Sequence, residues 1–476
     1  MRDMRRAWPG GSGGCEGGLS GPLGRPRTQG ESPGVRAFGE GIRLEWHKGC
    51  ERPKGRSQVT TPGSKEERQV REMKQTLPLK GIRVVDLTTS YAGPFCTMLL
   101  ADMGAEVIKI EEPCHGDDSR AWGPPFCEGG ISPWFLSANR NKKSVTLNLR
   151  QVEGLKILKA LVAKSDVFVV SMSKRVLNKM GLSYGELSSL NQGLIFCSIT
   201  GFGQTGPYSE RLCYDLIAEG IGGIMSVTGD NDQPQKVGTA AGDILAAHHA
   251  CFAIAACLYR RQTSGRGEFI DVCLLDSIVS FVTPRIVSFL ATGELPRPDA
   301  NRSTPLAIYQ PVKTKDGFLN LGVGNDRIWE RLCRALGLEE MLQIPQYATN
   351  AGRRKHREEI VRRLEEVLER EPTQYWFNYL GERGVPCGPI YYLNEVAADP
   401  HVKERGLIFY LEHEQVGLIP QVAPPWKLDT TEERFHSPPP NLGEHDDEVL
   451  REWLGMRDDQ IQRLRERGVI RKSKIA

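Results

Sequence analysis

Residues 79–111, LKGIRVVDLTTSYAGPFCTMLLADMGAEVIKIE, restrict the possible folds of this chain most. Residues 82–87 are apolar and rich in β-branched side chains, residues 92–94 begin a helical pattern, and Gly104 ends it before a second apolar run at 105–110. A strand, a helix and a second strand within about thirty residues are typical of a parallel sheet. The sequence therefore predicts an α/β fold.

The turn between the first strand and its helix differs from that of dinucleotide-binding proteins. Such turns carry three spaced glycines, which let the backbone approach a pyrophosphate. Residues 88–93 read TTSYAG and contain one glycine. The pattern therefore argues against NAD.

Strands and helices continue to alternate along the chain, which predicts a parallel sheet with helices on both faces. A smaller mixed segment follows from about residue 297 to 400, and GVPCGP at 384–389 predicts a tight turn. The expected strands are 144–149, 166–170, 194–199, 269–274, two within 309–323, and 416–421; the expected helices are 152–163, 242–261, 277–291, 326–336, 354–370, 446–454 and 458–467.

Residues 1–76 are rich in Gly, Arg and Pro and lack apolar periodicity, so we expect a disordered extension. An organellar transit peptide, which would imply the mitochondrial matrix, is an alternative, but Asp3, Glu16, Glu31 and Glu40 argue against it. A third reading is that translation starts at Met73, because KEER just upstream can be encoded by a purine-rich ribosome-binding site. The intact mass of the natural protein distinguishes these readings.

Charge and cysteine usage restrict the partners. The chain has 62 basic and 59 acidic residues, a formal charge of +3, which indicates neither a nucleic acid nor a membrane-surface partner. Twelve cysteines include no Cys-x-x-Cys pair, so we expect no zinc site and no other metal. Cys197, Cys251 and Cys273 lie in apolar runs, as buried thiols of a reducing cytoplasm do. The apolar run 246–259 is too short for a bilayer, which predicts no membrane span.

Asp243 is the strongest candidate for chemistry. It opens an apolar helix, where the helix dipole favours a negative charge, and its ordinary pKa of about 3.9 predicts an ionised side chain at neutral pH. Gly242 beside it leaves room for a substrate. Asp243 is therefore either a nucleophile toward an activated acyl group or only a helix N-cap.

The other candidates have weaker patterns. Asp215 follows a turn and either orients a ligand or hydrogen-bonds within its loop. His248 and His249 fall off the helical face of Asp243 and are expected to be core or interface residues. The basic pairs at 142–143 and 174–175 are candidate phosphate partners, although such pairs are usually solvated surface.

Six segments in a fixed order closely resemble the class III CoA-transferase family. That family includes formyl-CoA, crotonobetainyl-CoA and succinyl-CoA-dependent dicarboxylate CoA-transferases, together with 2-methylacyl-CoA racemases. The resemblance covers about residues 77–470 and is carried by the opening segment 79–111, NRNKKSVTLNL, CSITGFGQTGPYSERLCYDLIAEGIGGIMSVTG, TSGRGEFIDVCLLDS, GVPCGPI and PPPNLGEHDDEVL.

The resemblance implies an α/β fold with a Rossmann-like large domain and a small α/β domain, in an interlocked homodimer. The large domain is expected at 77–275, completed by 420–476, and the small domain at 300–400. It further implies that Asp243 attacks an acyl-CoA, with succinyl-CoA the expected donor, and passes CoA to a small carboxylic acid through a covalent aspartyl intermediate. No permanently bound cofactor is implied, because the CoA thioester is a substrate, and the expected location is cytoplasmic.

The residues expected to contact CoA by this resemblance lie at the first turn, at the end of the third strand and after the fourth; they are Tyr91, Ala92, Leu147, Arg150, Ser171, Lys174, Lys179 and Asp215. In relatives the loop at 170–175 commonly reads Glu-Asn-Phe-Arg-Pro-Gly. Here it is VSMSKR, in which Lys174 or Arg175 replaces the arginine, and Lys179 stands at a further basic position. The loop at 301–305, which covers the active site in several transferases, lacks glycine here.

Two alternative functions remain at this point. One is a racemase or isomerase of acyl-CoA, but racemases carry a histidine where this chain has Tyr214, and proton exchange at an α-carbon needs a base there. The other is a CoA-binding paralogue without turnover, suggested by the altered loop at 171–175.

Overall fold

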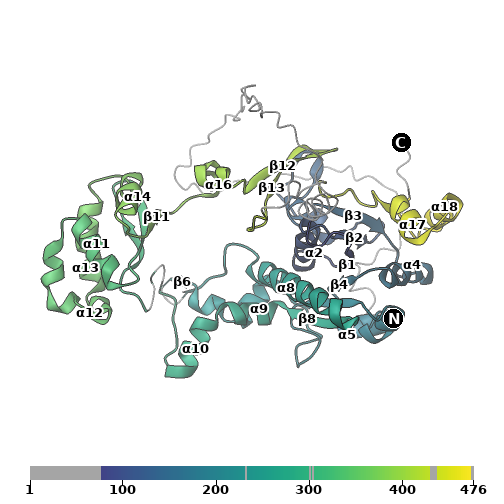
Figure 1. Ribbon diagram of the computed structural model, residues 1–476, viewed down its shortest axis with the longest axis horizontal. Coiled ribbons are helices and arrows are strands. Elements are labelled where there is room, and N and C mark those ends of the chain that lie inside the picture. Colours follow the sequence, from purple (N-terminus) through teal and green to yellow (C-terminus); the bar gives the residue numbers. More distant parts are fainter. Residues whose placement is uncertain (1–76, 231–232, 300–301, 303–304, 429–436, 473–476) are drawn as a thin grey trace, which may run out of the picture. The chain divides into compact units, whose positions relative to one another are not determined.

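The computed structural model describes residues 77–230, 233–299, 302, 305–428 and 437–472 (Figure 1). The predictions made for residues 1–76, and most of the loop at 301–305, lie outside the described residues.

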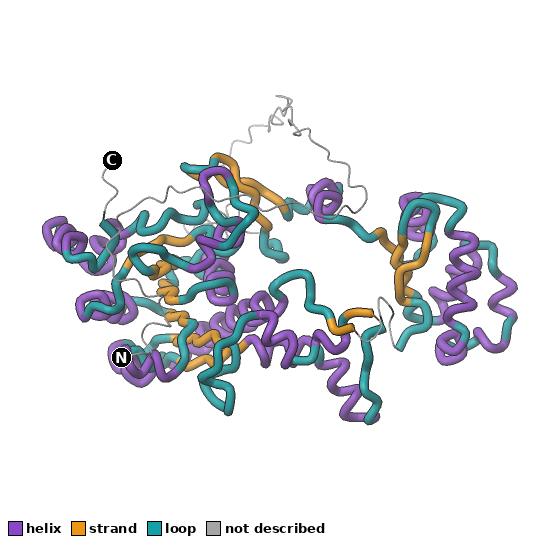
Figure 2. The backbone as a smooth tube through the Cα atoms, turned by 180° about the vertical axis from the view of Figure 1, so that it is seen from behind, coloured by secondary structure: helices purple, strands orange, loops and turns teal. Residues whose placement is uncertain are grey.

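A six-stranded parallel sheet forms the centre of the larger unit, in the order β3-β2-β1-β4-β5-β8 (Figures 1 and 2). This confirms the predicted α/β class with a parallel sheet. The order reverses between β1 and β4, and in such folds ligands bind in the crevice outside the carboxyl ends of the strands at this point. The strands are β1 (Arg83–Leu87), β2 (Glu106–Glu111), β3 (Lys142–Thr146), β4 (Val167–Val170), β5 (Ile195–Thr200) and β8 (Glu268–Cys273).

Helices cover both faces of this sheet, because alternate strand residues point to opposite sides. Val84 and Val107 belong to one core, whereas Val85 and Ile108 belong to the other. The first core includes α2 (Ala92–Asp102), α7 (Asp215–Ile221), α8 (Ala241–Ser264) and α9 (Leu274–Phe281). The second includes α4 (Val152–Ala163), α5 (Lys174–Met180), α6 (Tyr184–Leu190), α17 (Asp446–Leu454) and α18 (Asp458–Glu466).

A second unit has its own three-stranded antiparallel sheet, in the order β11-β10-β9, and a separate apolar core that includes Val312, Leu332 and Leu364. Its strands are β9 (Tyr309–Lys313), β10 (Phe318–Gly322) and β11 (Cys387–Pro389), and its helices are α11 (Asp326–Ala335), α12 (Asn350–Lys355), α13 (Arg357–Leu368) and α14 (Thr373–Glu382).

The remaining elements are short. Two antiparallel pairs are present, β6 (Gly229–Asp230) with β7 (Gln233–Pro234), and β12 (Ile408–His413) with β13 (Gly417–Val422). The helices are α3 (Pro133–Leu136), α10 (Thr283–Thr292), α15 (Leu393–Ala398) and α16 (Pro400–Glu404), with single 3₁₀ turns at Asp118–Ala121, Glu128–Gly130, Ile224–Val227, Glu339–Gln343 and Pro345–Tyr347.

Three predictions of local structure are wrong. The helix expected at 277–291 is two helices, α9 and α10, bent by 66°. Pro284 cannot donate a backbone hydrogen bond, and the Thr283 hydroxyl donates to the Ser280 carbonyl at 2.6 Å instead. The helix expected at 354–370 is interrupted at His356. The expected turn at 384–389 contains β11, whose Cys387 pairs with Leu321 across the sheet.

Helix α8 has the length and hydropathy of a membrane span by composition. It packs against α2, β5 and β8, and its buried residues, such as Ala246 and Ile254, belong to the core. This packing accounts for part of its apolar composition, because a core helix satisfies the same criterion.

Candidate functional site

Asp243 lies in the first turn of α8 rather than at its cap. The helix begins at Ala241, its N-cap residue is Ala240, and no side chain caps it. The N-cap interpretation is therefore wrong, because the helix starts before the Gly242-Asp243 pair on which that interpretation rested. The carboxyl group of Asp243 is partly buried, and no described residue donates a hydrogen bond to it. The side chain therefore has no evident structural task.

The surroundings of Asp243 disfavour its charge. Burial, and next the carboxylate of Asp215, raise the pKa of Asp243 to about 7. The sequence predicted full ionisation at neutral pH, whereas this pKa leaves the proton on about half of the molecules at pH 7. Perturbed carboxyl groups of this kind concentrate at functional sites.

Asp215 holds the start of α8. It begins α7, and its Oδ1 accepts a hydrogen bond of 2.7 Å from the backbone N–H of Gly242. A β-carbon at position 242 would lie 3.1 Å from the same oxygen, so glycine allows this close approach. Asp215 therefore makes a hydrogen bond between elements, immediately beside Asp243.

Tyr91 brings the first turn of the chain to the same place. It is buried, stacks on Phe95 at 5.6 Å between ring centroids, and packs in one cluster with Ala240 and, at its margin, Ile244. Burial raises the pKa of Tyr91, and the Asp243 carboxylate raises it further. The neighbouring Ala92 is buried in the core. The structure thus brings Tyr91 close to Asp243.

Ser171 joins the first turn at the crevice between β1 and β4. Its hydroxyl oxygen accepts a hydrogen bond of 3.3 Å from the backbone N–H of Thr89. Thr89 follows β1 and Ser171 follows β4, so this contact lies at the point where the strand order reverses. The turn 88–91 therefore reaches two places, the strand reversal through Thr89 and the neighbourhood of Asp243 through Tyr91.

The remaining predicted contacts with CoA differ in exposure. Lys174 and Lys179 are exposed on α5, and Arg150 is exposed after β3. The side chain of Leu147 is buried in the core, so any contact that it makes with a ligand must come from its backbone. Arg175 forms an ion pair with Glu210 at 3.3 Å.

Lys142 is not a phosphate partner, contrary to one sequence interpretation. Its ammonium group is fully buried, 3.2 Å from Asp86 and 2.8 Å from the Asn139 side-chain oxygen. Lys143 forms ion pairs with Glu106 and Glu448. The pair at 142–143 therefore belongs to the structure of the sheet.

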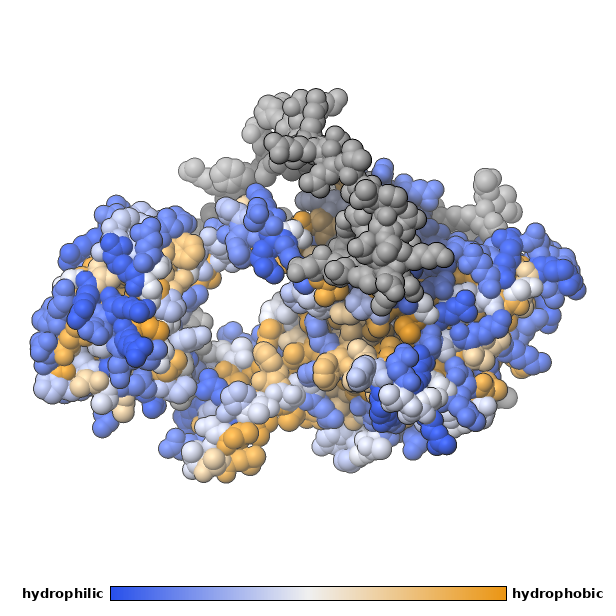
Figure 3. Space-filling model, viewed as in Figure 1, coloured by the Kyte–Doolittle hydropathy of each residue, from blue (hydrophilic) through white to orange (hydrophobic). Residues whose placement is uncertain are grey.

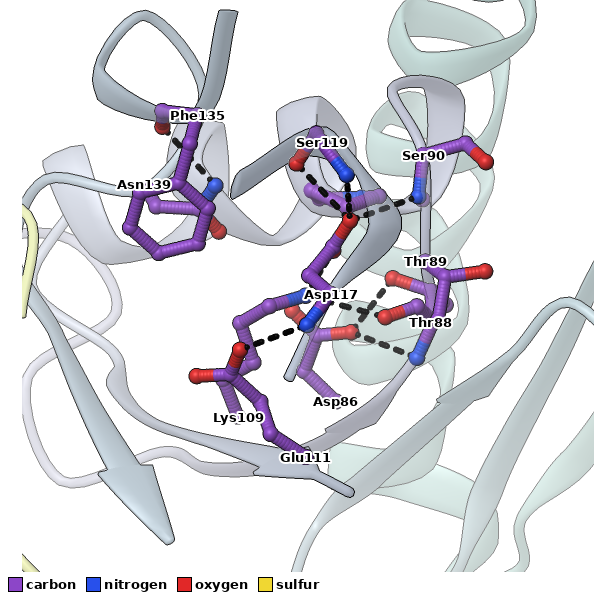
Figure 4. A network of polar contacts seen from close by, with 12 residues as sticks. Asp86, Thr88, Thr89, Ser90, Lys109, Glu111, Asp117, Ser119, Phe135 and Asn139 are labelled. Carbon is purple, nitrogen blue, oxygen red and sulfur yellow. Dashed lines mark hydrogen bonds and ion pairs between the residues drawn. The ribbon is translucent and has the colours of Figure 1, made fainter. Parts of the chain in front are cut away.

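A buried polar network beneath the first turn was not found by sequence reasoning (Figure 4). Lys109 donates to the Thr88 carbonyl at 2.9 Å and pairs with Asp117 at 2.7 Å. Asp117 accepts from the backbone N–H of Ser90, whose φ of 73° lies in the left-handed region. Asp86 accepts from both the N–H and the hydroxyl of Thr88. The network thus holds the carbonyl and amide groups of the turn.

Charges in this network stabilise one another. Burial acts to raise the pKa of Asp86, but Lys142 and Lys109 outweigh it and the pKa lies below its ordinary value. Burial likewise acts against the charge of Lys109, but Asp117 and Asp86 raise its pKa. The available sequence signal was a charged residue inside an apolar strand, in RVVDL and EVIKIE.

Among the described residues, no group of three or more His, Cys, Asp or Glu side chains is arranged to hold a metal ion. The cysteines Cys197, Cys251 and Cys273 are buried thiols, as their apolar surroundings indicated. His248 and His249 contact Ile244 and Ser277.

The fold and the site define a class of doubly wound α/β proteins, with a half-buried carboxylate at the start of a helix and a crevice at the strand reversal. The chain belongs to CoA-transferase family III, whose family model matches residues 79–446. It is therefore an enzyme of the CoA-transferase type, acting on CoA thioesters and carboxylates.

Two relatives and one crystal structure are similar to most of this chain. Succinyl-CoA:glutarate CoA-transferase of Homo sapiens is 39% identical over 400 residues, covering 84% of this chain and 91% of the relative. Succinate–glutarate CoA-transferase of Agrobacterium fabrum is 40% identical over 381 residues, covering 79% and 95%. A crystal structure of a CAIB/BAIF family protein from Brucella suis is 36% identical, with a TM-score of 0.71, covering 80% of this chain and all of that one.

Proposed function

We propose that this enzyme transfers CoA from succinyl-CoA to a small dicarboxylic acid such as glutarate, through a covalent intermediate on Asp243. The relatives named as succinyl-CoA:glutarate transferases support the substrate class. The observation that carries the mechanism is the Asp243 carboxylate, which is partly buried, lies at the start of α8 and makes no structural hydrogen bond among the described residues.

The reaction consists of four acyl exchanges. An Asp243 oxygen attacks the succinyl thioester carbonyl, the carbon–sulfur bond breaks, and CoA leaves as a thiolate from the mixed anhydride. The thiolate attacks the Asp243 carbonyl, so that succinate leaves and an aspartyl–CoA thioester forms. The acceptor carboxylate then displaces the thiolate to form a second anhydride. Finally the thiolate attacks the acceptor carbonyl, which gives the new acyl-CoA and restores Asp243.

The local structure suits this sequence. Partial burial leaves the Asp243 carboxylate poorly solvated, which strengthens it as a nucleophile but favours its protonation. The N-terminal end of α8 offsets part of that penalty, because its dipole stabilises a negative charge in the first turn. The crevice beside Thr89 and Ser171 lies at the position where α/β sheets bind extended ligands.

The racemase alternative is not favoured, because the named relatives are CoA-transferases and Tyr214 is 66% exposed at the position of the racemase histidine. Incubation without acceptor separates the two reactions. A racemase exchanges the α-proton of an acyl-CoA with deuterium from the solvent, whereas a transferase does not need to remove that proton.

The test uses succinyl-CoA and ¹³C-labelled glutarate. Wild-type enzyme should move the label into the thioester pool, and Asp243→Ala should lower this exchange by about 1,000-fold or more because the nucleophile is absent. Asp276→Asn is the control, because Asp276 is an exposed aspartate in the first turn of α9. Hydroxylamine should trap a hydroxamate on the peptide containing residue 243. Unchanged exchange in Asp243→Ala would falsify the assignment.

We also propose a homodimer, as the family resemblance implies. Exposed apolar side chains gather on α7–α10, which pack on one another (Figure 3). We call this set the apolar face; it comprises Leu216, Ile217, Ile221, Phe252, Tyr259, Phe281, Phe289 and Leu290. A patch of this kind supports a protein partner, and a second copy of the chain is the partner proposed here.

A further inference from the structure

Glu219 is a buried carboxyl group without an assigned task. It lies one turn after Asp215 on α7 and is fully buried. Its Oε2 accepts a hydrogen bond of 2.9 Å from the backbone N–H of Val237. Its Oε1 is enclosed, and no described group donates a hydrogen bond to it. The second oxygen of this side chain therefore has no hydrogen-bond donor among the described residues.

An ionised Glu219 would be costly in this position. A buried carboxylate oxygen without a hydrogen bond loses its solvation and gains nothing in return, which disfavours the charged form. Asp215 precedes Glu219 by four residues on the same helix, where side chains are neighbours, and its carboxylate raises the pKa of Glu219. Two carboxyl groups in contact are stable when one proton lies between them.

The charges around Glu219 agree with a neutral side chain. Burial raises the pKa of Glu219, and Asp215 on the same helix raises it further. The hydrogen bond from the backbone N–H of Val237 and the charge of the exposed Lys236 act in the opposite direction. The net effect is a pKa above the ordinary value of a glutamate.

We propose that Glu219 is a positioning residue. Its carboxyl group keeps its proton and donates a hydrogen bond to Asp215, and Asp215 in turn accepts the hydrogen bond from the Gly242 N–H beside Asp243. This inference rests on the proposed role of Asp243 as nucleophile. In this proposal Glu219 makes no contact with the substrate and acts only through Asp215.

The proton on Glu219 has a consequence for the nucleophile. Asp243 ionises next to the Asp215 carboxylate, which accepts a hydrogen bond from the Gly242 N–H and, in this proposal, a second one from Glu219. If Glu219 were also charged, the added repulsion would oppose ionisation of Asp243 still more. A neutral Glu219 thus keeps Asp215 in place without adding a second charge.

Infrared difference spectroscopy tests the proton directly. The spectrum of wild type minus Glu219→Gln at about pH 7 should contain the C=O stretch of a protonated carboxylic acid, which shifts in D₂O. A carboxylate band in its place overturns the proposal. This readout does not depend on turnover, so it remains decisive even if the Asp243→Ala variant refutes the nucleophile.

Steady-state kinetics tests whether Glu219 positions Asp215. Glu219→Ala should lower kcat by about tenfold, with a smaller change in KM for succinyl-CoA, because a hydrogen bond to a charged group is lost. Glu219→Gln keeps a donor and should recover most of the lost turnover. Its pH profile should keep the acid midpoint of the wild type. A midpoint shifted to lower pH means that the glutamate was charged, and equal loss in both variants means that the donor is not used; either result overturns the proposal.

Discussion

Asp243 illustrates a conflict at the scale of a single residue. A nucleophilic carboxylate must be ionised to attack, yet partial burial, which increases its reactivity, raises its pKa to about 7. The helix start and the Gly242 neighbour give access and some stabilisation of charge. As the proposed nucleophile, the side chain would be ionised on about half of the molecules at neutral pH.

This conflict predicts the pH dependence of the reaction. Below the pKa of Asp243, about 7, the residue is protonated and cannot attack, so kcat/KM should rise with pH up to about 8 and then level off. Above about pH 6.5 the free carboxyl groups of succinyl-CoA and glutarate are ionised and should not contribute. Initial rates from about pH 6.5 to 9 measure the profile. A flat profile through pH 7 would contradict a raised pKa at the nucleophile.

The same residue should limit stability. Because the folded state holds the Asp243 proton more tightly than the unfolded chain, the contribution of Asp243 to stability is largest below about pH 4 and falls as pH rises to about 7. Asp243→Asn imitates the neutral form and should stabilise the fold by about 1–3 kcal/mol at pH 8 but by much less at pH 5. Urea unfolding at both pH values measures this difference, with Asp276→Asn as control; an equal effect at both would contradict it.

The roles of some residues could be predicted from the sequence, whereas those of others could not. Asp243 and Asp215 lie near glycines and turns, so their patterns were visible before the fold was known. Glu219, Lys109 and Asp117 were missed, because each acts through a partner in another turn or strand. Lys142 was misinterpreted, since a lysine pair in sequence does not show which ammonium group is buried.

At the scale of elements, the first turn depends on the network below it. Asp117→Asn keeps an oxygen for the Ser90 amide but removes the charge that pairs with Lys109. Because this leaves a buried ammonium group with less compensation, we expect a loss of about 3–5 kcal/mol in unfolding free energy and a higher KM for succinyl-CoA. Urea unfolding and initial rates measure both effects.

The neighbouring Asp118→Asn serves as the matched control, because Asp118 is exposed and should change stability by less than about 0.5 kcal/mol. Adding Lys109→Met to Asp117→Asn should restore part of the lost stability, since it removes the unpaired charge. If Asp117→Asn were as stable as the wild type, the ion pair would not support the turn.

Most elements were predictable in type, because their apolar periods are long. The strands around 82–87 and 194–199 were within one or two residues of β1 and β5. The errors occurred where one residue outweighed the periodicity. Pro284 divides a continuous apolar run into α9 and α10, and Cys387 joins a strand because β10 offers a free edge.

At the scale of the whole molecule, the apolar face predicts the oligomeric state. Light scattering coupled to size exclusion should give the mass of two chains at micromolar concentration. Phe252→Glu and Leu290→Glu place charges at residues that are 78% and 73% exposed, and should reduce the dimer fraction. Val152→Glu is the control, at a 70% exposed residue of α4 that lies outside the apolar face. The mass of one chain for the wild type would contradict the homodimer.

The sequence by itself determined the α/β class, the family and the candidate nucleophile, because periodic burial, glycine turns and local motifs are properties of neighbouring residues. Only the tertiary structure decided the strand order, and with it the approach of Tyr91 and Asp215 to Asp243 and the contact of Ser171 with the first turn. It also decided which charges are buried in pairs and why the pKa of Asp243 is near 7. These properties depend on groups far apart in the chain, whose distance and solvation are set by packing rather than by local sequence.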